Sequence, residues 1–325
     1  MMKDKEDLLA PQRFTTDECM ELNEVSRLNK DWRTDYQQVG AGKFKAWFDL
    51  YASSNLRFTD QYCSQGMSVS GIAPDDHVAL VLPLNRGDRG VFQGREFGAN
   101  DVGLMVEHSE CFYRTPRNLR MMVVTIPVSR LPQALDAAAH KRELYQMIAE
   151  TSVISLDNAT IASLTSATRR VFEIIQSTSQ PAGLALCLQE IEEHIVTTLS
   201  LVMAGSPGPA RGALGRKNRL RYLERARTYI EAHLESPLGM ETLTLVAGTS
   251  TRSLETAFRE VLGVTPVQYI RYSRLNAAKS RLLRADSAMT SVTDTAQALG
   301  FSHLSRFAQN YRALFGELPS ATLAA

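Results

Sequence analysis

Two sets of side chains in the last quarter of the chain are of the types that contact the edges of DNA bases. Arginine donates two hydrogen bonds to guanine, glutamate accepts one from cytosine, glutamine pairs with adenine, and an alanine methyl group fits against that of thymine. A solvated helix face is the alternative, and the repetition of the set favours base contact. The candidates are Arg252, Glu255 and Thr256, followed 53 positions later in each case by Ser305, Ala308 and Gln309.

Other polar and basic side chains around these positions suit the sugar–phosphate backbone of DNA. Most hydrogen bonds between proteins and DNA go to phosphate and sugar, which position the protein without reading the sequence. His303 also fits an ordinary surface histidine. The backbone candidates are Ser250, Thr251, Arg259, Ser302, His303, Arg306 and Arg312.

The sequence pattern of the elements that must hold these side chains occurs twice in the chain. Each copy has an apolar stripe of helical spacing, followed by a glycine and, three residues later, a proline. The packing residues keep their apolar character while the outward residues vary, as expected for one scaffold that presents two different faces. The stripes are Leu254, Ala257, Phe258, Val261 and Leu262 in the first copy and Phe307, Tyr311, Leu314 and Phe315 in the second.

A short helix, a tight turn and a longer amphipathic helix are typical of the helix-turn-helix motif. We expect two such units, at residues 240–263 and 292–316, with Ser250 and Ser302 as N-caps of the longer helices. Thr265, Pro266 and Gln268 have the pattern of a capping box and predict a helix from there to about residue 284. Such a helix is about 28 Å long, which suits two reading helices in successive major grooves about 34 Å apart.

The charge distribution agrees with a partner that is a polyanion. Residues 216–325 hold 15 Lys and Arg against 9 Asp and Glu, and the remainder holds 21 against 26, so that charges of +6 and −5 make up the net +1. A basic segment on a slightly acidic body indicates a nucleic-acid-binding part.

We find no signal peptide and no apolar run of membrane-spanning length, and the four scattered cysteines fit the reducing cytoplasm.

The part of the chain before residue 205 has two kinds of sequence pattern, one typical of strands and one typical of helices. Residues 44–51, 77–84, 102–109 and 119–127 are strand-like and are separated by turn-prone clusters, which predicts a small barrel or sandwich. Residues 131–204 then have helical periodicity, in a segment that can pack on its own barrel or on a partner subunit. We therefore expect a regulatory and dimerisation domain at 10–204, a glycine- and proline-rich linker at 205–215 and a helical domain at 216–325.

Side chains that bind an effector are expected in the mouth of the barrel, where a few polar groups converge. Each candidate also fits a structural or superficial role, and the sequence names no ligand. Catalytic and phosphate-loop motifs are absent, so no enzyme activity, cofactor or metal site is expected. The effector-site candidates are Trp47, Tyr51, His77, Arg95 and His108.

The C-terminal third resembles the tandem helix-turn-helix domain of the AraC/XylS transcription regulators. The resemblance is carried by SxRxLxxxF at 250–258, FREVLGVTPVQY at 258–269, RLNAAKSRL at 274–282 and ALGFSHLSRFAQNYRALFGELPS at 298–320. The body is similar to the subgroup of the ethanolamine-operon regulator, through Lys43-Phe44 and Arg86-Gly87. Relatives of this type include virulence and quorum-sensing regulators. Thr256 departs from the family, which often has an arginine there.

The resemblance implies an α+β protein of two domains, an N-terminal cupin-like β-barrel with trailing helices and a C-terminal all-α tandem helix-turn-helix. It implies a homodimeric activator that binds double-stranded DNA in the cytoplasm, at the nucleoid, contacts RNA polymerase and responds to a small molecule. One alternative is a ligand-independent regulator of virulence or quorum-sensing genes, controlled by abundance or a protein partner. Another is a small-molecule-binding barrel whose helical tail is an interaction module.

Overall fold

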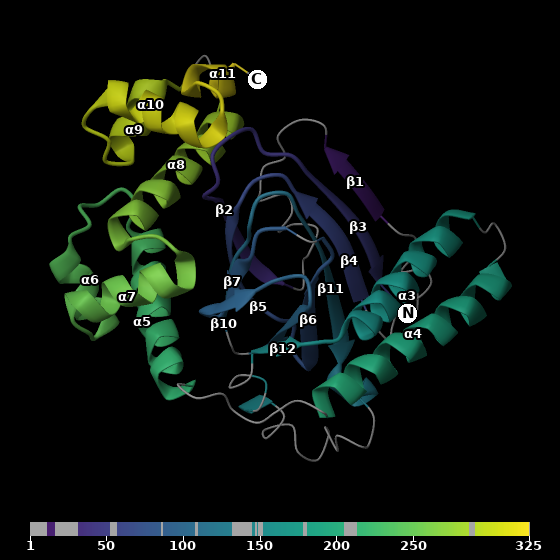
Figure 1. The fold of residues 1–325 in the computed structure, drawn as a ribbon. Coiled ribbons are helices and arrows are strands. Elements are labelled where there is room, and N and C mark those ends of the chain that lie inside the picture. The colour runs from purple at the N-terminus through teal and green to yellow at the C-terminus, as the bar shows by residue number, and fades with distance from the viewer. Residues whose placement is uncertain are drawn as a thin grey trace, which may run out of the picture.

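The computed structural model describes residues 12–16, 32–52, 57–85, 87–107, 110–131, 145–146, 148, 152–177, 181–204, 213–285 and 290–324. Two antiparallel sheets face each other in the N-terminal part, like a flattened barrel. Two helices, at residues 158–177 and 181–204, cover the outer side of one sheet. The C-terminal helices lie on the opposite side of the barrel, against the other sheet (Figure 1). Among the described residues, no helix is both long and apolar enough to cross a membrane.

The larger sheet has seven strands among the described residues, in the order β1-β3-β4-β11-β6-β9-β12. The smaller sheet has five, in the order β2-β5-β10-β7-β8. The strands of the larger sheet are β1 Gln12–Thr16, β3 Ala46–Ala52, β4 Arg57–Cys63, β11 Leu119–Pro127, β6 His77–Pro83, β9 Asp101–Val106 and β12 Val153–Ser155. Those of the smaller sheet are β2 Arg33–Gln38, β5 Met67–Ile72, β10 Glu110–Arg114, β7 Gly90–Phe92 and β8 Arg95–Phe97.

Both faces of the larger sheet are buried, and strand alternation divides its side chains between two cores. In β6, Ala79 and Val81 point between the sheets. Leu80 and Leu82 point outward, against α3 Asn158–Ser177 and α4 Pro181–Ala204. The single 3₁₀ turn that the described residues include, η2 Val128–Arg130, leads out of β11. The predicted strands and the trailing helices are confirmed, and β12 is an additional strand inside the segment that we expected to be helical.

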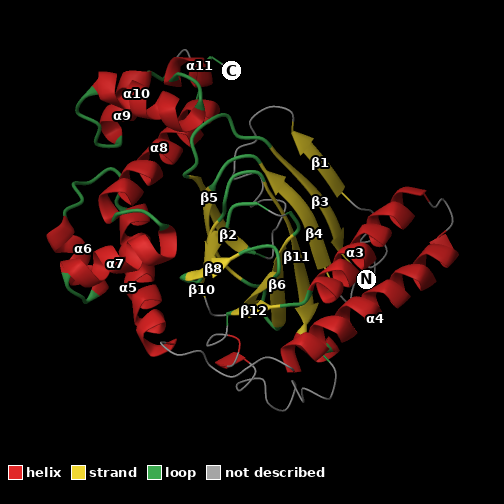
Figure 2. Ribbon diagram, viewed as in Figure 1, coloured by secondary structure: helices red, strands yellow, loops and turns green. Residues whose placement is uncertain are grey.

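The C-terminal part consists of helices, as Figure 2 shows. Its first helix starts inside the predicted linker, of which residues 205–212 lie outside the described part of the chain. The helices are α5 Ala213–Ala232, α6 Met240–Ala247, α7 Thr251–Leu262, α8 Pro266–Arg284, α9 Val292–Ala298, α10 Leu304–Phe315 and α11 Pro319–Leu323.

Both expected apolar stripes are buried, in separate cores. The α7 stripe packs with α5 and α6, and the α10 stripe packs with α8 and α9. Phe258 is 0% exposed and Phe307 is 1% exposed. The two helix pairs are therefore separate packing units, joined by α8.

The helix ends follow the sequence signals in all but one place. Ser250 accepts a hydrogen bond of 3.3 Å from the Ser253 amide, and Thr265 and Gln268 form the capping box. Gly263 and Gly316 end α7 and α10 with φ angles of 67° and 74°, a conformation that favours glycine. The expectation of Ser302 as a cap is wrong, because the N-cap of α10 is His303. The second turn is one residue longer and places Phe301 against Phe307.

Candidate nucleic-acid interface

The first set of base-contact candidates lies on the outward side of α7, opposite its buried stripe. Arg252 is exposed, and Glu255 and Thr256 are half-buried. The Thr256 hydroxyl donates a hydrogen bond of 2.8 Å to the Arg252 carbonyl oxygen, one turn back. Glu255 forms an ion pair of 3.5 Å with Arg259 on the next turn. Among the described residues, these contacts of Glu255 and Thr256 stay within their own helix.

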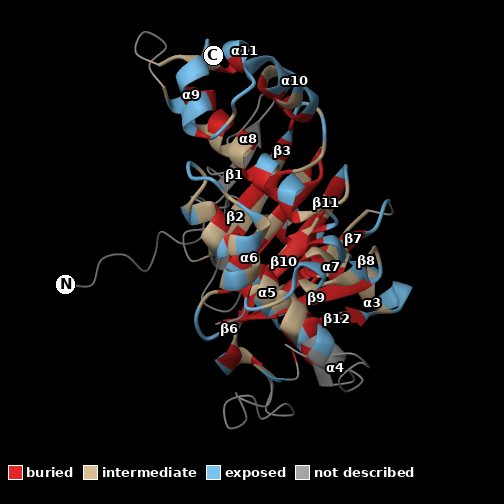
Figure 3. Ribbon diagram, turned by 90° about the vertical axis from the view of Figure 1, so that its left-hand side faces the viewer, coloured by how far each residue is buried: buried red, intermediate tan, exposed pale blue. Residues whose placement is uncertain are grey.

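The second set lies on the corresponding side of α10. Ser305 and Gln309 are exposed and Ala308 is half-buried between them. Figure 3 shows exposed residues gathered on α9 and α10. The two sets thus occupy equivalent positions on two helices of equal length, each 12 residues. A helix presented in this way has the shape and the functional groups that the major groove accepts.

The backbone candidates surround both faces. Ser250, as the N-cap of α7, is already engaged with its own helix, while Thr251 begins that helix. Exposure of these side chains suits contact with phosphates, which run along the edges of the groove. Ser250, Thr251, Arg259, Ser302, His303, Arg306 and Arg312 are all exposed.

The four effector-site candidates that the structure describes do not meet in one place. Trp47 and Tyr51 lie opposite Tyr62 and Phe58, on the outer face of the larger sheet. Tyr51 donates a hydrogen bond of 2.7 Å to Glu192 on α4. His77 Nδ1 lies 2.6 Å from the Asp75 carbonyl oxygen, and Arg95 donates to the Val153 carbonyl oxygen at 3.3 Å. His108 lies outside the described residues, and an effector role for these side chains stays a prediction.

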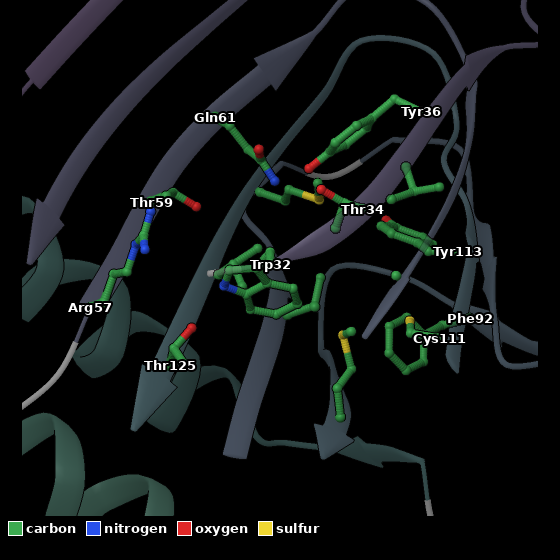
Figure 4. A pocket seen from close by; sticks show the side chains of 16 residues that line it. Trp32, Thr34, Tyr36, Arg57, Thr59, Gln61, Phe92, Cys111, Tyr113 and Thr125 are labelled. Carbon is green, nitrogen blue, oxygen red and sulfur yellow. The ribbon is translucent and has the colours of Figure 1, made fainter. Parts of the chain in front are cut away.

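A cavity of about 50 Å³ lies between the two sheets, and none of those four side chains lines it. Its walls combine aromatic side chains with hydroxyl, amide and guanidinium groups (Figure 4). An engineered apolar cavity that admits benzene measures about 150 Å³, so this one holds only a few atoms unless side chains move. The polar lining is Thr34, Arg57, Thr59, Gln61 and Thr125, and the large aromatic lining is Trp32, Tyr36, Phe92 and Tyr113.

Two titratable groups in the cavity wall are kept neutral by their surroundings. Burial raises the pKa of the Cys111 thiol and that of the Tyr113 hydroxyl, because the charged forms lose their hydration. The Tyr113 oxygen has no hydrogen-bond partner among the described residues. A neutral hydroxyl in this position can donate to a bound molecule.

A family model described as a helix-turn-helix domain matches residues 243–325. The "XylDLEGF operon transcriptional activator 1" of Pseudomonas putida is 38% identical over 269 residues, which cover 80% of this chain and 77% of that protein. The chain belongs to the AraC/XylS family of transcription regulators. As an AraC/XylS protein, it binds DNA through its helix-turn-helix domain.

Other AraC/XylS-type proteins match smaller parts of the chain or match it more distantly. A transcriptional regulator of Chromobacterium violaceum with an AraC-type DNA-binding domain is 31% identical, covers 34% of this chain and 94% of its own, and has a TM-score of 0.31. The AraC-like activator CuxR is 18% identical, covers 88% of this chain and 100% of its own, and has a TM-score of 0.44. The predicted likeness to the ethanolamine-operon subgroup stays a prediction.

Proposed function

We propose that this protein is a sequence-specific transcription activator that reads two successive major-groove segments, one with α7 and one with α10. The observation that carries the proposal is the repetition of an outward polar face at equivalent positions of two helices whose inner faces are buried in separate cores. No catalytic step is part of this function, and we expect the protein to act in the cytoplasm.

The helix between the two units has a suitable length. α8 has 19 residues, and a rise of about 1.5 Å per residue makes it about 28 Å long. Neighbouring major-groove segments on one side of the duplex are about 34 Å apart. A connection of this size brings α7 and α10 to adjacent turns of the same duplex.

Binding of DNA fragments to the full-length protein tests this function. We expect selection from sheared genomic DNA to recover a motif with two half-elements about one helical turn apart. Affinity for that motif should fall steeply and linearly with the logarithm of the salt concentration. Recovery of fragments without a shared motif, or binding that is indifferent to salt, would contradict the proposal.

Control by a small molecule in the cavity is the finer part of the proposal. The cavity has an apolar and aromatic wall with a few converging polar groups, which is the composition of ligand sites. Its lining suits a compact molecule with an apolar body and one group that pairs with Arg57, Thr59 or Gln61. The binding signal would then reach paired DNA-binding domains of a homodimer, and through them RNA polymerase.

A second mode of control, without a ligand, is also supported by an observation. The cavity that the described residues line between the sheets is small, at about 50 Å³, which is typical of a largely filled interior. A filled interior is what we expect of a ligand-independent regulator, which is controlled by its abundance or by a protein partner. A ligand-binding measurement on the cavity separates the two modes of control.

A further inference from the structure

Two strands of the smaller sheet have one side in the cavity and the other against the DNA-binding domain. In β2, Thr34 and Tyr36 line the cavity, whereas Gln37 contacts α8. In β10, Cys111 and Tyr113 line the cavity, whereas Phe112 packs into the C-terminal domain. This division follows from strand alternation, and it makes the sheet a common wall of the two domains.

The first helix-turn-helix unit is held by β10. Phe112 belongs to the same buried core as Leu254 and Phe258 of α7. Glu110 forms an ion pair with Arg227 of α5, and both side chains are only 10% exposed. The Arg227 guanidinium also lies over the Phe112 ring, at 5.6 Å. A buried ion pair fixes the relative position of its two elements, because either charge alone would be costly to bury.

The connecting helix α8 is held by β2. The Ser273 hydroxyl donates to Gln37 Oε1 at 3.0 Å. Asn276 pairs with the backbone of Gln38 twice, since its Oδ1 accepts from the Gln38 amide and its Nδ2 donates to the Gln38 carbonyl, each at 3.0 Å. Ser273 and Asn276 are three residues apart and so share one face of α8.

The second unit is held by the last residue of β2 and by the loop that follows it. The Leu314 carbonyl, near the end of α10, accepts from the Gln38 side chain at 2.8 Å and from the Gly42 amide at 3.0 Å. Carbonyls in the last turn of a helix have no partner within the helix, so the barrel supplies one. A Cβ atom on Gly316 would lie 2.9 Å from the backbone nitrogen of Lys43, which shows how closely the two domains fit.

These contacts leave both reading faces uncovered. Arg252 and Gln309 are exposed while the barrel contacts α5, α8 and the ends of α7 and α10. We propose that the barrel is a splint, which touches both helix-turn-helix units at once and fixes the spacing and orientation of α7 and α10. The docked form is then the form that reads DNA. This inference rests on the proposed function, because it assigns the barrel a role in reading two half-elements.

Affinity for DNA sites with altered spacing tests the splint. The full-length protein is measured on its selected site and on sites whose half-elements are moved together or apart by one or two base pairs. The parent should discriminate sharply against altered spacing. Asn276→Ala, which removes the pairing with Gln38, should bind the parental site less tightly and reduce the discrimination about five- to tenfold.

A second pair of variants separates docking from folding. Gly316→Ala places a methyl group against Lys43, whereas Gly248→Ala imposes a similar backbone strain, at a φ of 67°, with only the Arg225 side chain nearby. Gly316→Ala should lose spacing discrimination and Gly248→Ala should keep it. Val267→Ala, at a 65% exposed position of α8, is the control for Asn276→Ala.

Three results would overturn the splint. Variants that bind more tightly at every spacing would show that docking inhibits DNA binding. Variants that fold like the parent and keep its spacing discrimination would show that the barrel does not set the geometry. A parent protein that recognises no specific site at any spacing would refute the proposed function itself, and the splint with it.

Discussion

Single side chains on the reading face are paired weakly enough to change partners. The Glu255 and Arg259 side chains are 41% and 62% exposed, and an exposed pair of this kind within one helix contributes about 0.3–0.5 kcal/mol. A good contact with a base edge discriminates by about 1–3 kcal/mol. We therefore expect DNA to displace this ion pair rather than to be excluded by it.

Within the cavity, the Thr59 hydroxyl tests control by a small molecule. If a ligand binds between the sheets, a panel of small organic molecules should include one that raises the melting temperature of the full-length protein. Thr59→Val keeps the shape of the wall but removes a polar group. This variant should therefore need about ten times more ligand for the same rise in melting temperature. Thr244→Val, on α6, should leave the shift unchanged. A panel in which no compound stabilises the protein would favour ligand-independent control.

At the scale of elements, the aromatic stripes decide whether each helix-turn-helix unit forms. Phe307 contacts Phe301 and Tyr311, with ring centroids 4.9 and 5.7 Å apart. These rings belong to the buried core of the second unit, together with Leu314 and Phe315. The stability of α10 therefore depends on a few residues of its inner face.

Phe307→Ala should destabilise the second unit by about 3–5 kcal/mol, because it removes a buried ring and leaves a cavity. Denaturant unfolding of the full-length protein, followed by circular dichroism, measures the loss. Leu245→Ala, at an 81% exposed position, is the control and should unfold like the parent. A Phe307→Ala protein as stable as the parent would contradict the assignment of the stripe.

The helical elements could be predicted from the sequence because their signals are local. The stripes of α7 and α10, the cap at Ser250 and the capping box at Thr265 each depend on residues within one or two turns. The cap of α10 was misplaced by one residue, because the turn before it is longer and the position of Phe301 depends on the core.

The cavity could not be predicted, because the larger sheet is buried on both faces. In β4, the apolar Phe58 points outward to the trailing helices, while Arg57, Thr59 and Gln61 point to the cavity. The usual rule of apolar residues inside and polar residues outside therefore fails for this strand. Residues 57–63 were not among the strands expected from the sequence, and nothing local to them indicates that α3 and α4 cover the outer face of the sheet.

At the scale of the whole molecule, the basic C-terminal third packs against an acidic body through buried polar contacts. The interface buries Gln37, Gln38 and Ser273, whose exposed fractions are 6%, 2% and 2%. Polar groups buried in this way specify one arrangement, because any other would leave them unpaired. In the tandem reader that we propose, this fixes α7 and α10 relative to each other, as recognition of a two-part site requires.

The most direct test is to repeat the DNA selection with Arg252→Ala and with Gln309→Ala in the full-length protein, beside the parent. We predict that each variant relaxes sequence preference in one half-element only, that the two affected positions lie about one helical turn apart, and that each loss is about 1–3 kcal/mol. Equal weakening on all sequences, or relaxation of the same half-element by both variants, would contradict a tandem reader.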